Sequence, residues 1–175
     1  MKTAAVFLLC VTHHRANTIV LQDGIVLKIR TFTESDRPFL QEIYLQARRK
    51  TWTWLDADQW NLGDFDNVTQ DESIWVAEFA GRPVGFASVW TPDNFLHHLF
   101  VSPEAQGHGV GSALLQYVQC QFTGTGSLKC LLDNHPALTF YQRHGWYIEA
   151  RGESPDGPYY LMHYSLPAGT TLPPL

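Results

Sequence analysis

Residues 99–112 read LFVSPEAQGHGVGS, and this stretch joins an apolar run to the start of a helical pattern. Gly107, Gly109 and Gly111 alternate within it, so backbone N–H groups can approach a ligand without an intervening Cβ atom. Apolar residues at helical spacing follow over 112–122. The N-terminus of a helix favours anions because its free N–H groups lie at the positive end of the helix dipole. The stretch therefore predicts a loop that binds phosphate or pyrophosphate.

Two common phosphate-binding loops do not match this pattern. A dinucleotide fingerprint needs glycines at offsets zero, two and five, but the last position is Ser112 counted from Gly107 and Leu114 counted from Gly109. A P-loop needs Gly-Lys followed by Ser or Thr, and the chain has no such tripeptide. Two other interpretations stay open at this point. One is a nucleotide or sugar-phosphate binder, and the other is a tight strand-to-helix turn without a ligand.

The composition suits one folded domain, because 45% of the 175 residues are apolar and only 17% are charged. A net charge of -5 argues against a nucleic-acid partner. Cys10, Cys120 and Cys130 are widely spaced, so neither a disulfide scaffold nor a metal site is expected. The apolar run over 4–11 is too short to span a membrane and lacks a small-residue cleavage site. We therefore expect a cytoplasmic protein without a membrane partner.

The chain divides into a leader, a body and a tail. The leader, 1–24, either packs as an extra strand or is flexible, and the working domain covers 25–166. Residues 167–175 contain three prolines and no periodic pattern, which indicates a loose tail.

Strand and helix patterns alternate within the body, which indicates an α/β (α+β) fold. Helices are expected after a cap at Ser35, over 112–122 and over 137–144, with one short helix within the loop-rich segment 52–67. Strands are predicted over 26–32, 74–79, 84–90, 95–101, 128–132, 146–150 and 159–164.

Two motifs within this body match a known family. The residues from Gln106 to Gly111 resemble the Gln/Arg-x-x-Gly-x-Gly/Ala signature of the GNAT superfamily, the acyl-CoA-dependent N-acetyltransferases. A second motif of that family, Asn-x-x-Ala-x-x-Phe-Tyr-x-x-x-Gly-Phe, is similar to 134–146, where Trp146 replaces the usual final Phe. The resemblance implies a mixed, mostly antiparallel twisted sheet flanked by helices, with two splayed parallel strands at its centre.

The resemblance also implies acetyl-CoA as co-substrate and no metal. The diphosphate would lie on the backbone N–H groups of 107–112, and the pantetheine arm would run along the end of the preceding strand. Asn134 either bonds the cofactor or caps its own helix. The implied cofactor-binding residues are Leu99, Phe100, Val101, Gln106, Gly107, His108, Gly109, Val110, Gly111, Ser112, Asn134, Ala137, Phe140 and Tyr141.

Tyr141 occupies the position of the family's usual acid. A phenol of pKa about 10 is a weaker acid than a thiol near 8.5, so we expect it to donate a hydrogen bond to the developing thiolate. In a stronger version of this role, Tyr141 transfers its proton fully to the thiolate. Alternatively, Tyr141 is a tyrosine of the core without a catalytic role.

A base is also required, because deprotonating an alkylammonium at neutral pH costs about 4 kcal/mol. Many relatives carry a glutamate on the strand before the glycine loop, but that position is Phe95 here. His97 and His98 follow, and strand alternation predicts that they point to opposite faces. His97 shares the face of Phe95, so it is the first candidate for base or water-holder and His98 the second. Alternatively, one histidine is buried and the other solvated.

An aromatic acceptor cleft would suit a cationic amine, aided by Asp56 or Asp58. The same aromatic rings could instead form core or a partner patch. The candidates are Trp52, Trp54, Trp60, Trp90 and Tyr159.

The predicted reaction is direct transfer of an acetyl group to a primary amine of a small molecule or peptide. Cys120 falls late on a helix and Cys130 within an apolar strand, so neither is placed for an acyl-enzyme. The alternative is a non-catalytic acyl-CoA-binding regulatory module. The sequence leaves open whether the protein forms a homodimer.

Overall fold

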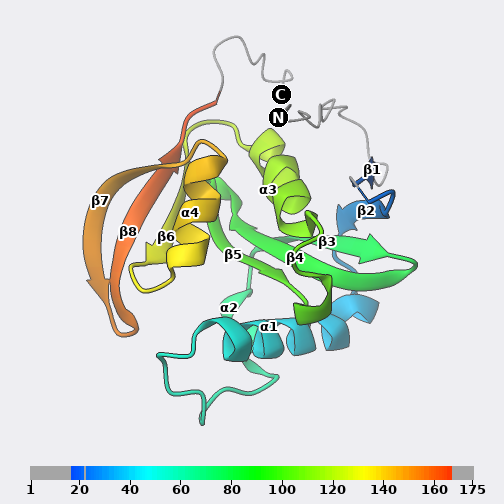
Figure 1. The fold of residues 1–175 in the computed structure, drawn as a ribbon, viewed down its shortest axis with the longest axis horizontal. Helices are drawn as coiled ribbons and strands as arrows, with labels where there is room; N and C mark the ends of the chain where they lie inside the picture. The colour runs from blue at the N-terminus through cyan, green and yellow to red at the C-terminus, as the bar shows by residue number, and fades with distance from the viewer. Residues whose placement is uncertain (1–16, 22, 167–175) are drawn as a thin grey trace.

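The computed structural model describes residues 17–21 and 23–166. Eight strands form one sheet in the order β1-β2-β3-β4-β5-β6-β8-β7 (Figure 1). Every neighbouring pair is antiparallel except β5 and β6. The strands are β1 (Asn17–Val20), β2 (Val26–Thr31), β3 (Ser73–Phe79), β4 (Arg82–Trp90), β5 (Phe95–Val101), β6 (Gly126–Leu131), β7 (Tyr147–Ser154) and β8 (Gly157–Tyr164).

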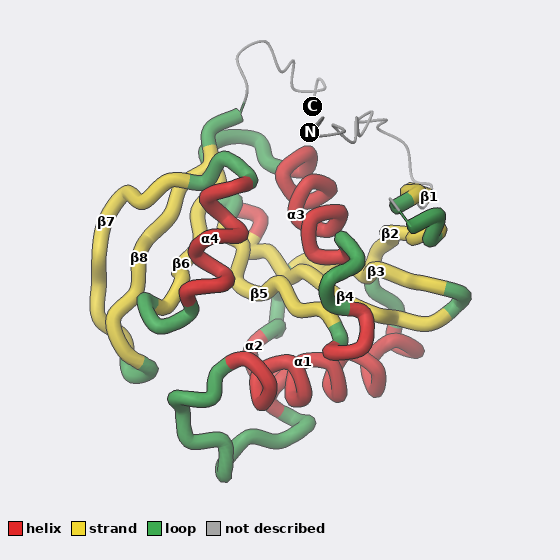
Figure 2. Tube along the Cα trace, viewed as in Figure 1, coloured by secondary structure: helices red, strands yellow, loops and turns green. Residues whose placement is uncertain are grey.

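Helices cover both faces of the sheet (Figure 2). The helices α1 (Arg37–Thr51) and α2 (Asp64–Val68) pack on one face, and α3 (Val110–Gln121) and α4 (His135–Arg143) pack on the other. Strand alternation separates the two cores. Val76 of β3 belongs to the α1 side, whereas its neighbour Ala77 belongs to the α3 side. The predicted α/β class and mostly antiparallel sheet are confirmed.

The start of α1 differs from the prediction. Ser35 lies inside a 3-10 turn, Glu34–Asp36, that precedes the helix, so its expected role as the cap is wrong. Asp36 holds this turn instead, because its Oδ2 accepts hydrogen bonds from the Thr33 backbone and from Arg30, at 2.8 and 2.7 Å. Pro38 still lies in the first turn of the helix, where its missing N–H group costs little.

The parallel strands at the centre of the sheet are splayed. β5 and β6 pair at one register position, Phe95 opposite Ser127, whereas β6 and β8 pair at six. Both residues lie at or near the beginning of their strands, so the strands diverge toward their carboxyl ends. The glycine-rich stretch follows the end of β5, and α4 begins shortly after the end of β6. The predicted splay is confirmed, and it opens between these two segments.

Part of the predicted leader forms the first strand. β1 pairs with β2 over four positions, and Ile19 and Leu21 are buried in the α3-side core. Residues 17–20 therefore form a strand at the edge of the sheet, next to β2. The rest of the leader, with its apolar run, and the predicted tail over 167–175 lie outside the described residues. In residues 17–21 and 23–166, no helix has the length and apolar character needed to cross a membrane.

Candidate active site

The glycine loop turns twice through backbone conformations that favour glycine. Gly107 and Gly109 have φ values of +84° and +87°, and α3 begins directly afterwards at Val110. A Cβ atom on Gly107 would meet nothing within 4 Å, and one on Gly109 would meet only Leu21 at 3.8 Å. Backbone conformation, rather than crowding, therefore requires glycine at both positions.

Six consecutive backbone N–H groups in this loop, those of residues 107–112, are free as far as the described residues are concerned. In the described part of the chain none of them donates a hydrogen bond, and no side chain caps α3. The first helical bond runs from the Ala113 N–H to the Gly109 carbonyl at 3.1 Å. Unpaired N–H groups at a helix N-terminus form a site for an anion. These free N–H groups belong to Gly107, His108, Gly109, Val110, Gly111 and Ser112, and phosphate binding by these residues stays a prediction.

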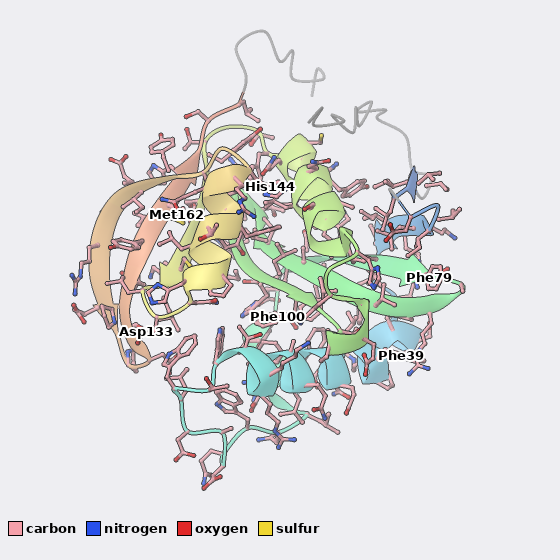
Figure 3. All side chains as sticks on the ribbon, in the orientation of Figure 1. Phe39, Phe79, Phe100, Asp133, His144 and Met162 are labelled. Atoms are coloured by element: carbon pink, nitrogen blue, oxygen red, sulfur yellow. The ribbon has the colours of Figure 1, made fainter. Side chains whose placement is uncertain are left out.

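Gln106 holds this loop against the end of β5. Its Nε2 donates a hydrogen bond to the carbonyl of Val101 at 3.1 Å, so its side chain supports the loop from within. On the outer side, His108 Nδ1 lies 3.3 Å from a carboxylate oxygen of Asp23, in the β1–β2 turn. The side chain of Phe100 packs on the α1 side of the sheet (Figure 3), and Leu99 and Val101 pack on the α3 side.

The second predicted motif forms α4 beside the splay. Asn134 is its N-cap, and Oδ1 of Asn134 accepts a hydrogen bond from the Ala137 N–H at 3.3 Å. The capping role is therefore present, and cofactor contact by Asn134 stays a prediction. Phe140 reaches across to α3, since its ring would lie 3.7 Å from a Cβ atom placed on Gly111. α4 thereby closes one side of the opening between β5 and β6.

Tyr141 lies on α4 among the rings of Phe140 and Trp146, with centroids 5.3 and 6.0 Å away. Burial, followed by the nearby Cys130, raises the pKa of Tyr141 above its ordinary value of 10. In the described ranges its hydroxyl has no hydrogen-bond partner. Tyr141 can thus act as a protonated, uncommitted donor, as its predicted role requires.

Neither described cysteine is suited to nucleophilic attack. Burial raises the pKa of the Cys130 thiol to about 11, so at neutral pH it is a thiol rather than a thiolate. Cys120 lies in the last turn of α3, far along the helix from its N-terminus. Across 17–21 and 23–166, no three His, Cys, Asp or Glu residues are grouped to hold a metal ion.

His97 and His98 do not point to opposite faces as predicted. The register between β4 and β5 slips so that Ser88 faces His98 and Val89 faces Leu96, which leaves His97 as the extra residue of a β-bulge. Nδ1 of His97 contacts Oε1 of Glu72, and Nδ1 of His98 lies 3.9 Å from Oε2 of the same carboxylate. The side chains do not alternate here because a bulge interrupts the strand. His97 does contact Phe95, with ring centroids 4.5 Å apart, as expected.

The two histidines differ in their environments. The His97 side chain is 42% exposed, and burial together with the Lys129 ammonium lowers the pKa of its imidazole from 6.5. His98 lies 2.8 Å from the Ser88 hydroxyl, and its ring packs on that of Tyr44 at 5.5 Å. Burial lowers the pKa of His98 to about 3. His97 is therefore the more accessible of two neutral imidazoles, and the role of either one as the base stays a prediction.

Known proteins resemble this chain in sequence. The acetyltransferase (GNAT) domain family matches residues 70–148. The peptidyl-lysine N-acetyltransferase YiaC of Escherichia coli strain K12 is 32% identical over 125 residues, which cover 69% of this chain and 83% of that protein. The chain belongs to the GNAT family of acetyltransferases. The predicted family and enzyme class, an N-acetyltransferase, are confirmed.

Solved structures share the fold of this GNAT chain. The apo form of YjaB from Escherichia coli has a TM-score of 0.67 at 21% identity, covering 80% of this chain and 98% of YjaB. The PaiA N-acetyltransferase of Thermoplasma acidophilum, solved in complex with coenzyme A, has a TM-score of 0.65 at 16% identity, covering 80% and 99%. The predicted GNAT-like fold is thus confirmed.

The aromatic residues predicted to bind the acceptor do not form one cluster among the described residues. Trp52 packs on Trp60 and Phe100, with centroids 6.1 and 5.8 Å away, and among the described residues no ring contact joins Trp54, Trp90 or Tyr159 to it. Trp54 and Trp90 are exposed, and the Lys129 ammonium lies 4.8 Å from the ring of Tyr159. Asp56 and Asp58 are exposed on the loop between α1 and α2.

An internal cation occupies part of the predicted aromatic surface. The Arg48 guanidinium lies 3.8 Å from the ring of Tyr44 and 4.9 Å from that of Trp60, and it is paired with Asp64 at 3.0 Å. Arg48 and Glu72 contact residues of the predicted site, Trp60 and His97, but were not themselves predicted from the sequence. Their contacts are set by the fold, because Glu72 meets His97 across 25 positions of sequence and no local motif links them.

The buried His98 predicts acid-sensitive stability. Its pKa is near 3 in the folded chain and about 6.5 when unfolded, so the unfolded chain binds the extra proton between these values. This contribution to the free energy of unfolding is complete above about pH 6.5 and falls by about 1.4 kcal/mol per pH unit below it. Urea unfolding of His98→Gln from pH 7 to 4 should show a shallower decline than the parent chain.

His135→Gln is the matched control, because His135 is exposed. It should keep the parent slope. Equal slopes in the parent and His98→Gln would contradict the assignment of a neutral, buried His98.

Proposed function

We propose that this chain is an acetyl-CoA-dependent N-acetyltransferase that transfers the acetyl group directly to a primary amine of a small molecule or peptide. The lysine side chain of a peptide is the first acceptor to test. The observation that carries the proposal is the row of free N–H groups over residues 107–112 at the start of α3. The peptidyl-lysine acetyltransferase YiaC and the coenzyme A complex of PaiA support the choice of acceptor and cofactor.

The loop fits the diphosphate of acetyl-CoA. Six unpaired N–H donors and the positive end of a helix dipole match a group that carries negative charge and several acceptor oxygens. Gly107 carries no side chain, and the space where its Cβ atom would lie is open. The divergent edge of β5 beyond Phe95 can bind the pantetheine amides as an added strand would.

Tyr141 and His97 supply the proton chemistry. Bound acetyl-CoA would supply an acetyl group activated as a thioester. The Tyr141 hydroxyl, protonated because its pKa is raised, donates a hydrogen bond toward the thiolate that develops on the leaving group. His97, neutral at pH 7 because its pKa is lowered, accepts a proton from the acceptor ammonium. The raised pKa of Cys130 disfavours an acyl-enzyme.

An acceptor screen tests the proposal directly. Release of free coenzyme A thiol is measured with acetyl-CoA and a panel of lysine peptides, N-terminal amine peptides, polyamines and small amines. We expect saturable turnover with at least one primary amine. Saturable acetyl-CoA binding without turnover across the panel would favour the non-catalytic module. Thermal stabilisation by ATP or NAD but not by acetyl-CoA at equal concentration would favour a nucleotide site.

The cytoplasmic location and the homodimer stay predictions.

Gly107→Asp tests the loop. The new carboxylate would point into open space beside the expected diphosphate, so we expect the Kd for coenzyme A to rise by about tenfold or more through charge repulsion. Calorimetric titration with coenzyme A measures it. Gly81→Asp is the matched control, because Gly81 has a φ of +78°, lies in the β3–β4 turn and also has nothing within 4 Å of its Cβ position. Equal affinities in the two variants would refute the loop as the anion site.

Tyr141→Phe tests the donor. We expect kcat to fall by about 100-fold, since one hydrogen bond to developing negative charge is lost, while the KM for acetyl-CoA stays within about twofold. Tyr147→Phe is the control, because Tyr147 is an exposed tyrosine of β7. Steady-state kinetics with the best acceptor of the panel distinguish them. A kcat for Tyr141→Phe equal to that of the control would mean that Tyr141 contributes only to packing and not to catalysis.

A further inference from the structure

Glu72 is a buried carboxylate outside the predicted site. It directly precedes β3, and its side chain is only 3% exposed. Its neighbours identify the face on which it lies, because Ile74 and Val76, two and four positions later, pack in the α1-side core. Glu72 thus lies on the face of the sheet that carries His98, Phe100 and α1.

The carboxylate is only partly satisfied. Oε1 contacts Nδ1 of His97, whereas Oε2 is buried and has no hydrogen-bond partner in the described part of the chain. A buried charge is costly unless a partner compensates it. The nearest groups that can become cationic are the two imidazoles. A proton on either imidazole would therefore be stabilised by the negative charge of Glu72.

Of the two imidazoles, His97 is the one that can carry a proton. His98 is held on the Ser88 hydroxyl at 2.8 Å and is enclosed by the rings of Tyr44 and Phe100. Its pKa near 3 keeps it neutral. His97 occupies the bulge, where its ring is 42% exposed. Because Nδ1 of His97 is engaged by Glu72, Nε2 is the ring nitrogen left for a substrate.

We propose that Glu72 is the positioning residue of His97: its carboxylate accepts the Nδ1–H, fixes the tautomer with a lone pair on Nε2, and stabilises the imidazolium formed during the reaction. This inference rests on the proposed acetyltransferase function. In the step, an N–H bond of the acceptor ammonium breaks and an Nε2–H bond forms. The positive charge passes from the ammonium to the imidazole, next to Glu72, and the amine keeps the electron pair that attacks the thioester carbonyl.

Two charged groups face His97, one on β6 and one directly before β3. Lys129 of β6 disfavours the imidazolium, and the neutral His98 beside it on β5 adds no charge. Arg48 of α1 acts on His98 and is itself paired with Asp64. Glu72, before β3, is the carboxylate in contact with His97 and opposes Lys129. Removing its charge should therefore leave His97 a weaker base.

Glu72→Gln separates the charge from the hydrogen bond, because the amide keeps an acceptor oxygen and the shape of the side chain. Nitrogen-15 NMR of the full-length protein with labelled histidine reports the tautomer and the pKa of His97. We expect Nδ1–H in the parent and a fall in the His97 pKa of about one to three units in the variant. We also expect kcat at pH 7 to fall by about tenfold or more, with the KM for acetyl-CoA within about twofold.

Glu78→Gln is the matched control. Glu78 is another partly buried carboxylate of β3, but it pairs with Arg30 at 2.7 Å, away from His97. It should leave the His97 titration unchanged. An unchanged His97 pKa in Glu72→Gln, or the same change in Glu78→Gln, would overturn the proposal. If Glu72→Gln does not fold, Glu72→Asp replaces it, and the shorter acid should keep the charge effect but lower kcat.

A double-mutant cycle tests the coupling to activity. In a His97→Ala background, Glu72→Gln should lower kcat by less than about twofold, because the residue that it positions is gone. Full additivity of the two losses would overturn the positioning role. The NMR titration does not require turnover. If no amine is acetylated but the His97 pKa still depends on Glu72, the proposed function fails while the Glu72–His97 pair stands.

Discussion

The two halves of the sheet are joined by one register position, Phe95 opposite Ser127. Beyond it, β5 and β6 diverge, so the edge of β5 that faces β6 lacks a strand partner in the described chain. Backbone groups left unpaired in this way are costly when buried, and they favour a ligand that can pair with them. The glycine loop and α4 follow from the open ends of these two strands. The divergence therefore positions both the N–H groups of residues 107–112 and the side chain of Tyr141.

The sheet separates two kinds of chemistry. On the α3 side lie the free loop amides and α4 with Tyr141, which suit an anionic cofactor and its leaving thiolate. On the α1 side lie Glu72, Ser88 and His98, and the ring of His98 packs against Tyr44 of α1. Strand alternation keeps these sets apart, and the bulge at His97 breaks the alternation where β5 and β6 still meet. The imidazole of His97, the proposed proton acceptor, is thereby placed close to the position where β5 and β6 begin to diverge.

Local patterns predicted much of this arrangement. The alternate glycines, the helical spacing after them and the second motif lie within about fifty residues, and each acts through its own backbone conformation. The splay followed from family resemblance rather than from any residue pattern. The bulge at His97 could not be predicted, because it depends on the pairing of β5 with β4. The contact of His97 with Glu72 and the ring contacts of Arg48 are likewise products of packing, so Glu72 was missed and the aromatic residues were predicted as one surface.

The proposed function depends on the free N–H groups at the start of α3, which would bind the cofactor diphosphate. Amide proton–nitrogen NMR during titration with coenzyme A measures these groups one by one. If the proposed function is correct, the signals of residues 107–112 shift together and saturate with a single Kd, while those of the β3–β4 turn at Gly81 stay in place. Saturating coenzyme A that leaves the six loop signals unmoved would contradict it.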